Sequence, residues 1–188
     1  MLDARRRRLL AIVAAAAGAA GVLAATAAAA TEHQSGARIR VLDGTKVSIN
    51  RFLQDNLHFT PGTITVRSGS ELTFSYGDKG QQDPHTITIV PKGSLPRTPQ
   101  QVFNCRICQQ LATPHLKNPK APPSDTNTIV HFTLNKGQPG LDTVGDSIAI
   151  APKGAHRTHS IVVSAPAGTT LRFVCAVHPW MQGTIRVV

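Results

Sequence analysis

A cysteine, a histidine and a methionine lie within seven residues near the end of the chain, in the stretch CAVHPWM. Cys175, His178 and Met181 offer a thiolate, an imidazole and a thioether, which are soft or borderline metal ligands. Each follows the one before by three positions, so one bend of the chain can turn all three side chains toward a single point. The alternative is that three unrelated residues end a strand together.

Strand periodicity separates these two interpretations. Side chains alternate between the two faces of a strand. In TTLRFVC, residues 169–175, Cys175 shares its face with leucine and phenylalanine, so it points toward a core. In PHTITIV, residues 84–90, His85 shares its face with two isoleucines. Together with the loop, the two strands supply two imidazoles, one thiolate and one thioether, which match a trigonal His₂Cys copper site with a weak axial methionine.

The same residues carry a family resemblance. The stretch CAVHPWMQGTIRVV resembles the copper-ligand loop of the cupredoxins, in its amicyanin- and plastocyanin-like form, and FTPGTITVRSGSELTFSY and DPHTITIV are similar to the family's hairpin and first-histidine strand. The likeness covers roughly residues 59–90 and 158–188. It implies one copper ion that carries single electrons, with the ligands His85, Cys175, His178 and Met181. It also implies an electron-exit surface around His178, Pro179 and Trp180.

This sequence departs from the family pattern at two places. Thr86 follows the first histidine where plastocyanin and amicyanin carry asparagine, so the resemblance does not supply the hydrogen bond that supports the ligands from outside. The stretch between the first-histidine strand and the final strands is much longer than in those small relatives. Partner and substrate assignments therefore do not carry over.

Short alternating segments with turn signals and no long amphipathic helix predict an all-β sandwich. The family resemblance implies that this is a cupredoxin-like Greek-key β-sandwich. Strands are expected at residues 38–41, 46–51, 128–134, 146–151, 159–163 and 184–188, besides the two strands above. Residues 59–76 are expected to form a hairpin with one buried side, turning at residues 68–70.

Residues 91–127 hold seven of the thirteen prolines and little strand pattern, which indicates a long proline-rich insertion within one domain. FNCRICQQL within it could form one or two helical turns. In an exported protein, Cys105 and Cys108 are expected to form a structural disulfide. A thiol redox motif or an extra metal-binding pair is the alternative. Haem attachment is excluded, because Gln109 and not histidine follows the second cysteine.

The first thirty residues have the pattern of a secretory signal peptide: Arg5 to Arg8, an alanine-rich apolar stretch, then small residues at possible cleavage sites. The alternative is an uncleaved membrane anchor, because the stretch is long enough to span a bilayer. Residues 31–188 then form a single domain, periplasmic or at the cell surface. Cleavage would leave a net charge of +7, since four arginines and one aspartate are removed.

That charge favours redox partners with an acidic docking surface. Nucleic acid is not expected as a partner, since aromatics are scarce and no basic run lies beyond the signal. His33, His58, His115 and His131 have no supporting pattern, and His156 and His159 fall on opposite strand faces.

The leading interpretation is therefore an exported single-electron carrier with no catalytic residues. The alternatives are a copper carrier or storage module and the copper domain of a redox enzyme. Val174 and Ala176 flank Cys175 where copper oxidases and nitrite reductases usually place histidine, so a link to a second copper is missing.

Overall fold

Three β-sheets and two short α-helices make up the part of the chain that the computed structural model describes, residues 36–42, 44–78, 83–121 and 128–188. All of these residues belong to one unit, His33–Val188. The predicted signal at residues 1–30 lies outside the described residues. No helix in the described ranges is long and apolar enough to cross a membrane.

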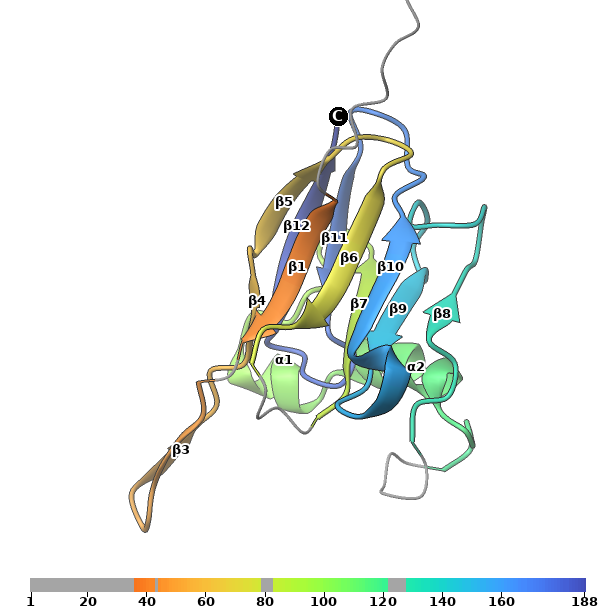
Figure 1. The fold of residues 1–188 in the computed structure, drawn as a ribbon. Helices are drawn as coiled ribbons and strands as arrows, with labels where there is room; N and C mark the ends of the chain where they lie inside the picture. Colours follow the sequence, from red (N-terminus) through yellow and green to blue (C-terminus); the bar gives the residue numbers. More distant parts are fainter. Residues whose placement is uncertain (1–35, 43, 79–82, 122–127) are drawn as a thin grey trace, which may run out of the picture. The chain divides into compact units, whose positions relative to one another are not determined.

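Two of the sheets form a β-sandwich (Figure 1). The four-stranded sheet has the order β10 (Thr158–Val162), β6 (Glu71–Tyr76), β1 (Ala37–Leu42), β4 (His58–Thr60). The six-stranded sheet has the order β5 (Thr63–Val66), β12 (Gln182–Val187), β11 (Thr170–Val174), β7 (His85–Val90), β9 (Ser147–Ile150), β8 (Thr133–Leu134). The predicted all-β sandwich is confirmed, and β7 and β11 pair as antiparallel neighbours in the second sheet.

The core lies between these two sheets. Apolar side chains of β1 and β6 meet those of β7, β11 and β12 in one buried cluster. Phe59 of β4 connects the layers, because its ring lies 5.9 Å from Phe74 in the first sheet and 5.1 Å from Phe173 in the second. Edge-to-face contacts of this kind add to the stabilisation from area burial alone. The core thus reaches the end of β11, where the cysteine lies.

The expected hairpin over residues 59–76 is wrong. β5 pairs in parallel with β12, whereas β6 pairs with β1 and β10, so the two segments belong to different sheets. The turn between them crosses the sandwich, and Ser68 and Gly69 donate their backbone N–H groups to Val188 and Val163. Alternation correctly indicated one buried face on each segment, but it carries no information about which strand lies beside it.

The expected strand at residues 46–51 is shorter and lies outside the sandwich. β2 (Lys46–Ser48) pairs only with β3 (Phe52–Gln54), and the two-stranded ribbon extends away from both sheets (Figure 1). Val47 and Ile49, whose positions alternate along this segment, are 64% and 79% exposed. Their alternation therefore does not mark a core face here.

The described part of residues 91–127 contains two short α-helices and a 3₁₀ turn. α1 (Pro99–Phe103) is capped at its N-terminus by Thr98, whose side chain accepts a hydrogen bond from Gln101 N. α2 (Arg106–Ala112) runs into the 3₁₀ turn η1 (Thr113–His115). The predicted helical turns over FNCRICQQL are thus confirmed. A second 3₁₀ turn, η2 (Gly154–Arg157), precedes β10. These helices pack against the end of the six-stranded sheet through α2, where Cys108 contacts a small cluster with Val90 and Val174.

Candidate metal centre

The fold brings the predicted ligands to one end of the six-stranded sheet. His85 is the first residue of β7, and Cys175 follows directly after β11. His178 and Met181 lie in the short loop that returns the chain to β12. Cys175 donates its backbone N–H to the carbonyl of Met181, and Met181 donates to the carbonyl of His178, each at 2.9 Å. These two bonds hold the loop in a closed turn.

Three donor atoms converge inside this turn. The Nδ1 atoms of His85 and His178 are 3.2 Å apart, and the sulfur of Cys175 lies 3.9 Å from the first and 3.7 Å from the second. His85 and Cys175 are fully buried, and His178 is 9% exposed. The three residues therefore form a compact group that could hold a metal ion.

The spacing of these atoms fits one metal ion. Protein metal–nitrogen distances are about 2.0 Å and metal–thiolate distances about 2.3 Å. In a trigonal arrangement these lengths separate the nitrogens by about 3.5 Å and each nitrogen from sulfur by about 3.7 Å. The observed separations of 3.2, 3.7 and 3.9 Å agree within a few tenths of an ångström. Two imidazoles and a thiolate in this geometry are a copper donor set.

Met181 lies near these three residues in the protein interior. Its side chain is 1% exposed and belongs to the core cluster that also contains Cys175. A thioether is a soft ligand that serves as a long, weak axial donor beside a His₂Cys plane. The structure thus brings three predicted ligands together in a group that accommodates one copper ion, and it places Met181 nearby.

Burial at this site disfavours the charged forms of Cys175 and His178, and a bound metal ion would change that balance. Burial raises the pKa of the Cys175 thiol, and hydrogen bonds from the backbone N–H and the side chain of Thr86 oppose that rise. Burial also lowers the pKa of His178, against the attraction of Asp83, whose Oδ2 is 4.0 Å from Nε2. A neutral imidazole is the form that coordinates, and a cation beside the sulfur would stabilise the thiolate.

Thr86 supports the ligands although it replaces the asparagine of the similar family. Its hydroxyl accepts a hydrogen bond from Ala176 N at 2.8 Å, and its backbone N–H donates to the Cys175 sulfur at 3.4 Å. A bond between the His85 strand and the cysteine loop is therefore present. Tyr76 packs edge-on against the His85 ring at 5.6 Å and donates its hydroxyl proton to the carbonyl of Asp83.

The predicted exit residues lie at the edge of the site. The ring of Trp180 is 5.2 Å from that of His178 and is 39% exposed, while Pro179 is half-buried. A depression of about 610 Å³ separates this loop from α1 and α2, and its lining includes Val177, Trp180 and Phe103.

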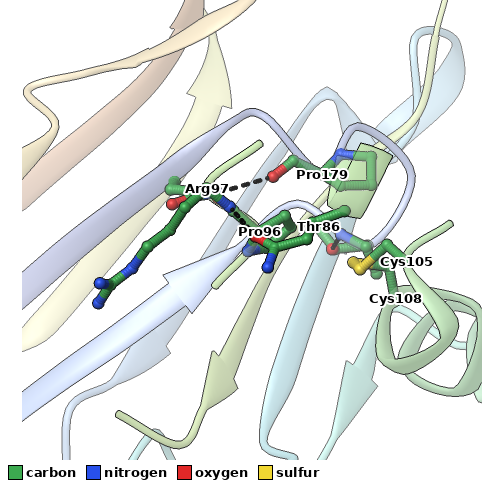
Figure 2. The surroundings of a disulfide bond; sticks show 9 residues. Thr86, Pro96, Arg97, Cys105, Cys108 and Pro179 are labelled. Atoms are coloured by element: carbon green, nitrogen blue, oxygen red, sulfur yellow. Dashed lines mark hydrogen bonds between the residues drawn. A yellow bond between two sulfur atoms is a disulfide. The ribbon is translucent and has the colours of Figure 1, made fainter. Parts of the chain in front are cut away.

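Cys105 and Cys108 form a disulfide in this structure, with Cα atoms 5.2 Å apart (Figure 2). Both are buried against Val174, the residue before Cys175. The adjoining segment is tied to the loop by Gln182, whose side chain donates to the carbonyls of Pro96 and Pro179. The disulfide thus lies beside the metal centre.

Sequence reasoning missed a row of polar residues behind the site. His115, Thr88 and Ser147 are fully buried and hydrogen-bonded in series. The alternation in HTITIV placed two threonines on one face of a strand that turns out to be buried on both faces. Polar side chains on such a strand need hydrogen-bond partners inside the protein. The two threonines in HTITIV were therefore the sequence signal for a buried polar row.

The two-sheet sandwich and the donor set agree with the resemblance to the cupredoxins that the sequence shows. No family model and no curated protein sequence matches the chain. Solved structures with a similar fold include a purple cupredoxin from Nitrosopumilus maritimus, at 13% identity and a TM-score of 0.41, covering 81% of this chain and 99% of that one.

Two further similar structures are an oxidised plastocyanin from Dryopteris crassirhizoma and auracyanin A from Chloroflexus aurantiacus. The first is 19% identical with a TM-score of 0.38, covering 81% of this chain and all of that one. The second is 19% identical with a TM-score of 0.39, covering 70% of this chain and 89% of that one.

Proposed function

We propose that this protein is an exported blue copper protein that carries single electrons between redox partners. The observation that supports this most directly is the buried group of two imidazole nitrogens and one thiolate sulfur, all within 4.8 Å of one another. A copper ion bound there would supply one-electron chemistry, because it cycles between Cu(I) and Cu(II). The residues of the chain determine how readily that cycle runs.

The site is built to keep its shape in both oxidation states. His85 is fixed by β7, and Cys175 is fixed by the backbone bond to Met181 and by the bond from Thr86. Packing and hydrogen bonds that hold ligand side chains in place keep one geometry for both oxidation states, so little rearrangement accompanies electron transfer. Burial of Cys175 and His85 also excludes water from the metal position.

The electron would leave through the loop that carries His178. Its ring is the most exposed of the three donor groups, and the partly exposed Trp180 lies next to it. This is the surface at which we place partner docking. The positive charge of the chain beyond residue 30 favours a partner with an acidic docking surface. Export follows from the signal pattern in the first thirty residues.

An electron carrier is favoured over a copper enzyme by the residues beside the cysteine. Val174 and Ala176 provide no ligand, so the cysteine has no neighbouring histidine that would lead to a second copper. In the described ranges, the structure contains no other group of three or more His, Cys, Asp or Glu side chains placed to hold a metal. The site therefore supports passing electrons singly.

The visible spectrum tests the proposal. The purified protein loaded with Cu(II) should be blue or blue-green, because charge transfer from a thiolate to copper absorbs strongly in the visible range. Cys175→Ser should abolish the colour, whereas the matched double variant Cys105→Ala/Cys108→Ala, which removes only the disulfide sulfurs, should keep it. A colourless Cu(II) protein with an ordinary tetragonal spectrum would contradict the proposal.

A further inference from the structure

A buried histidine of the 91–127 stretch is joined to the metal centre by hydrogen bonds. His115, at the end of η1, is fully buried. Its Nδ1 lies 2.5 Å from the carbonyl oxygen of His131, and its Nε2 lies 2.7 Å from the hydroxyl of Ser147 in β9. Both ring nitrogens are therefore engaged, although sequence analysis gave this residue no role.

The series continues through three hydroxyl groups to the ligand loop. The Ser147 oxygen is 2.7 Å from that of Thr88, and Thr88 donates to the Thr86 hydroxyl oxygen at 3.1 Å. Thr86 also accepts from Ala176 N, and its own side chain interacts with the Cys175 sulfur. All three hydroxyl residues are fully buried, so water does not compete for these bonds.

Counting protons shows that this series is one short when His115 is neutral. A carbonyl only accepts, so the single ring proton is on Nδ1, and Nε2 must accept from Ser147. Ser147 then has no proton for Thr88, and Thr88 already donates to Thr86. Either the contact between Ser147 and Thr88 lacks a proton, or the hydroxyls of Thr88 and Thr86 donate in the opposite direction. In the second case the Thr86 proton points away from Cys175.

When His115 is cationic, every contact in the series has a proton to share. Both ring nitrogens then donate, so Ser147 receives a hydrogen bond and each hydroxyl donates to the next in line. The direction from Thr88 to Thr86 that the structure shows is the direction this state requires. The Thr86 proton is then available to the Cys175 sulfur. The charge on His115 thus decides which way the series runs.

We propose that His115 is a positioning residue that acts through Ser147, Thr88 and Thr86 to direct a hydrogen bond at Cys175 and so to set the reduction potential of the copper site. The proposal rests on the proposed copper function. Hydrogen bonds to the cysteine sulfur tune the potential of such sites, because they withdraw electron density from the thiolate. His115 itself does not touch a ligand.

Electron and proton are coupled in this arrangement. Reduction brings one electron from the redox protein partner and adds negative charge at the thiolate end, which favours uptake of one proton from solvent by His115 at the other end. Oxidation releases both. The reduction potential should therefore fall as pH rises through the range in which His115 titrates.

The surroundings of His115 define that range. Burial lowers the pKa of His115, the hydrogen bond to the His131 carbonyl opposes this, and the His131 ring lowers it further. Arg106 on α2 is exposed. Lys117, two residues after His115, is also exposed. Asp146 lies next to Ser147, and its carboxylate accepts from backbone N–H groups of the loop 136–143. The titration should lie below the ordinary histidine pKa of about 6.5.

The test is a redox titration of the copper-loaded protein between pH 5 and pH 8. The potential should fall with rising pH in the wild type, and His115→Gln should lose most of that dependence while keeping its colour. Ser147→Ala removes the hydroxyl that links His115 to Thr88 but keeps His115, and it should also lose most of the pH dependence. The control His159→Gln removes a histidine outside the series and should behave like the wild type. The proposal is overturned if the reduction potential of the wild type does not depend on pH, or if His115→Gln keeps the same pH dependence.

A second measurement does not depend on copper. In the copper-free protein, ¹H–¹⁵N NMR of the His115 ring should show the proton on Nδ1 at pH 8 and on both nitrogens at low pH. A neutral ring protonated on Nε2 would overturn the proposal. Failure of the chain to bind copper would instead count against the proposed function, so the two failures are distinguishable. A pH dependence of the potential that is common to all variants would overturn the proposal as well.

Discussion

The hydroxyl of Thr86 accepts a hydrogen bond from the backbone N–H of Ala176 at 2.8 Å and so ties the His85 strand to the cysteine loop. Both groups are buried, and an unpartnered buried N–H costs about 1–3 kcal/mol. Thr86→Val, which keeps the shape and removes the hydroxyl, should therefore lower the unfolding free energy by about that amount. Urea denaturation of the copper-free protein measures it. Thr86→Ser restores the hydroxyl and should recover most of the loss; equal losses in both variants would refute the role of the bond.

Met181 should affect the reduction potential of the copper site but should not be required for copper binding. Leucine has a similar volume, so Met181→Leu should cost less than about 1.5 kcal/mol in stability. If the Met181 thioether is a weak ligand of a bound copper ion, its loss should shift the reduction potential while the visible colour persists. Spectroelectrochemistry on the two proteins gives both results at once. Complete loss of copper binding in this variant would show that methionine is a main ligand.

Gly183, next to the ligand loop in β12, leaves room for the core. A Cβ atom there would collide with the ring of Phe173 and lie 2.7 Å from the carbonyl oxygen of Gly62. Gly183→Ala should therefore destabilise the protein by about 1–3 kcal/mol, as overpacked core positions do. The matched control is Gly62→Ala, where the nearest atom to a new Cβ is 3.9 Å away. Thermal unfolding should separate the two variants, and equal melting temperatures would argue against the clash.

Acid should destabilise the copper-free protein through its histidines. Burial lowers the pKa of His115 and of His159 below the ordinary histidine value. The unfolded chain then binds more protons than the folded one as pH falls below about 6.5, so stability is full above that pH and declines below it. Urea unfolding at pH 7.5 and pH 5.5 measures the decline. The double variant His115→Gln/His159→Gln should show a smaller decline, and an unchanged one would assign the effect to other groups.

Much of the metal centre could be predicted from local pattern. Alternation of side chains turned Cys175 and His85 inward, and both are fully buried. The loop spacing delivered His178 and Met181 to the same end of the sheet. These inferences succeeded because strand parity is a property of each backbone segment alone.

Pairing could not be predicted in the same way. β5 and β6 are close in sequence and joined by a turn, yet they lie in different sheets and pair with β12 and with β1 and β10. The ribbon of β2 and β3 alternates like a core strand but leaves Val47 and Ile49 in solvent. Which strand lies beside which depends on the whole core, and a segment's own pattern does not contain that information.

The sequence by itself determined the donor types, their spacing and the inward direction of the two strand ligands, because these depend on chemistry and on local backbone geometry. Only the tertiary structure decided that Thr86 bonds across the site and that His115, thirty residues from His85 in the chain, connects to it through Ser147 and Thr88. Hydrogen bonds between buried side chains require atoms from separate strands to lie within about 3 Å. Such distances are fixed by the packing of the complete fold.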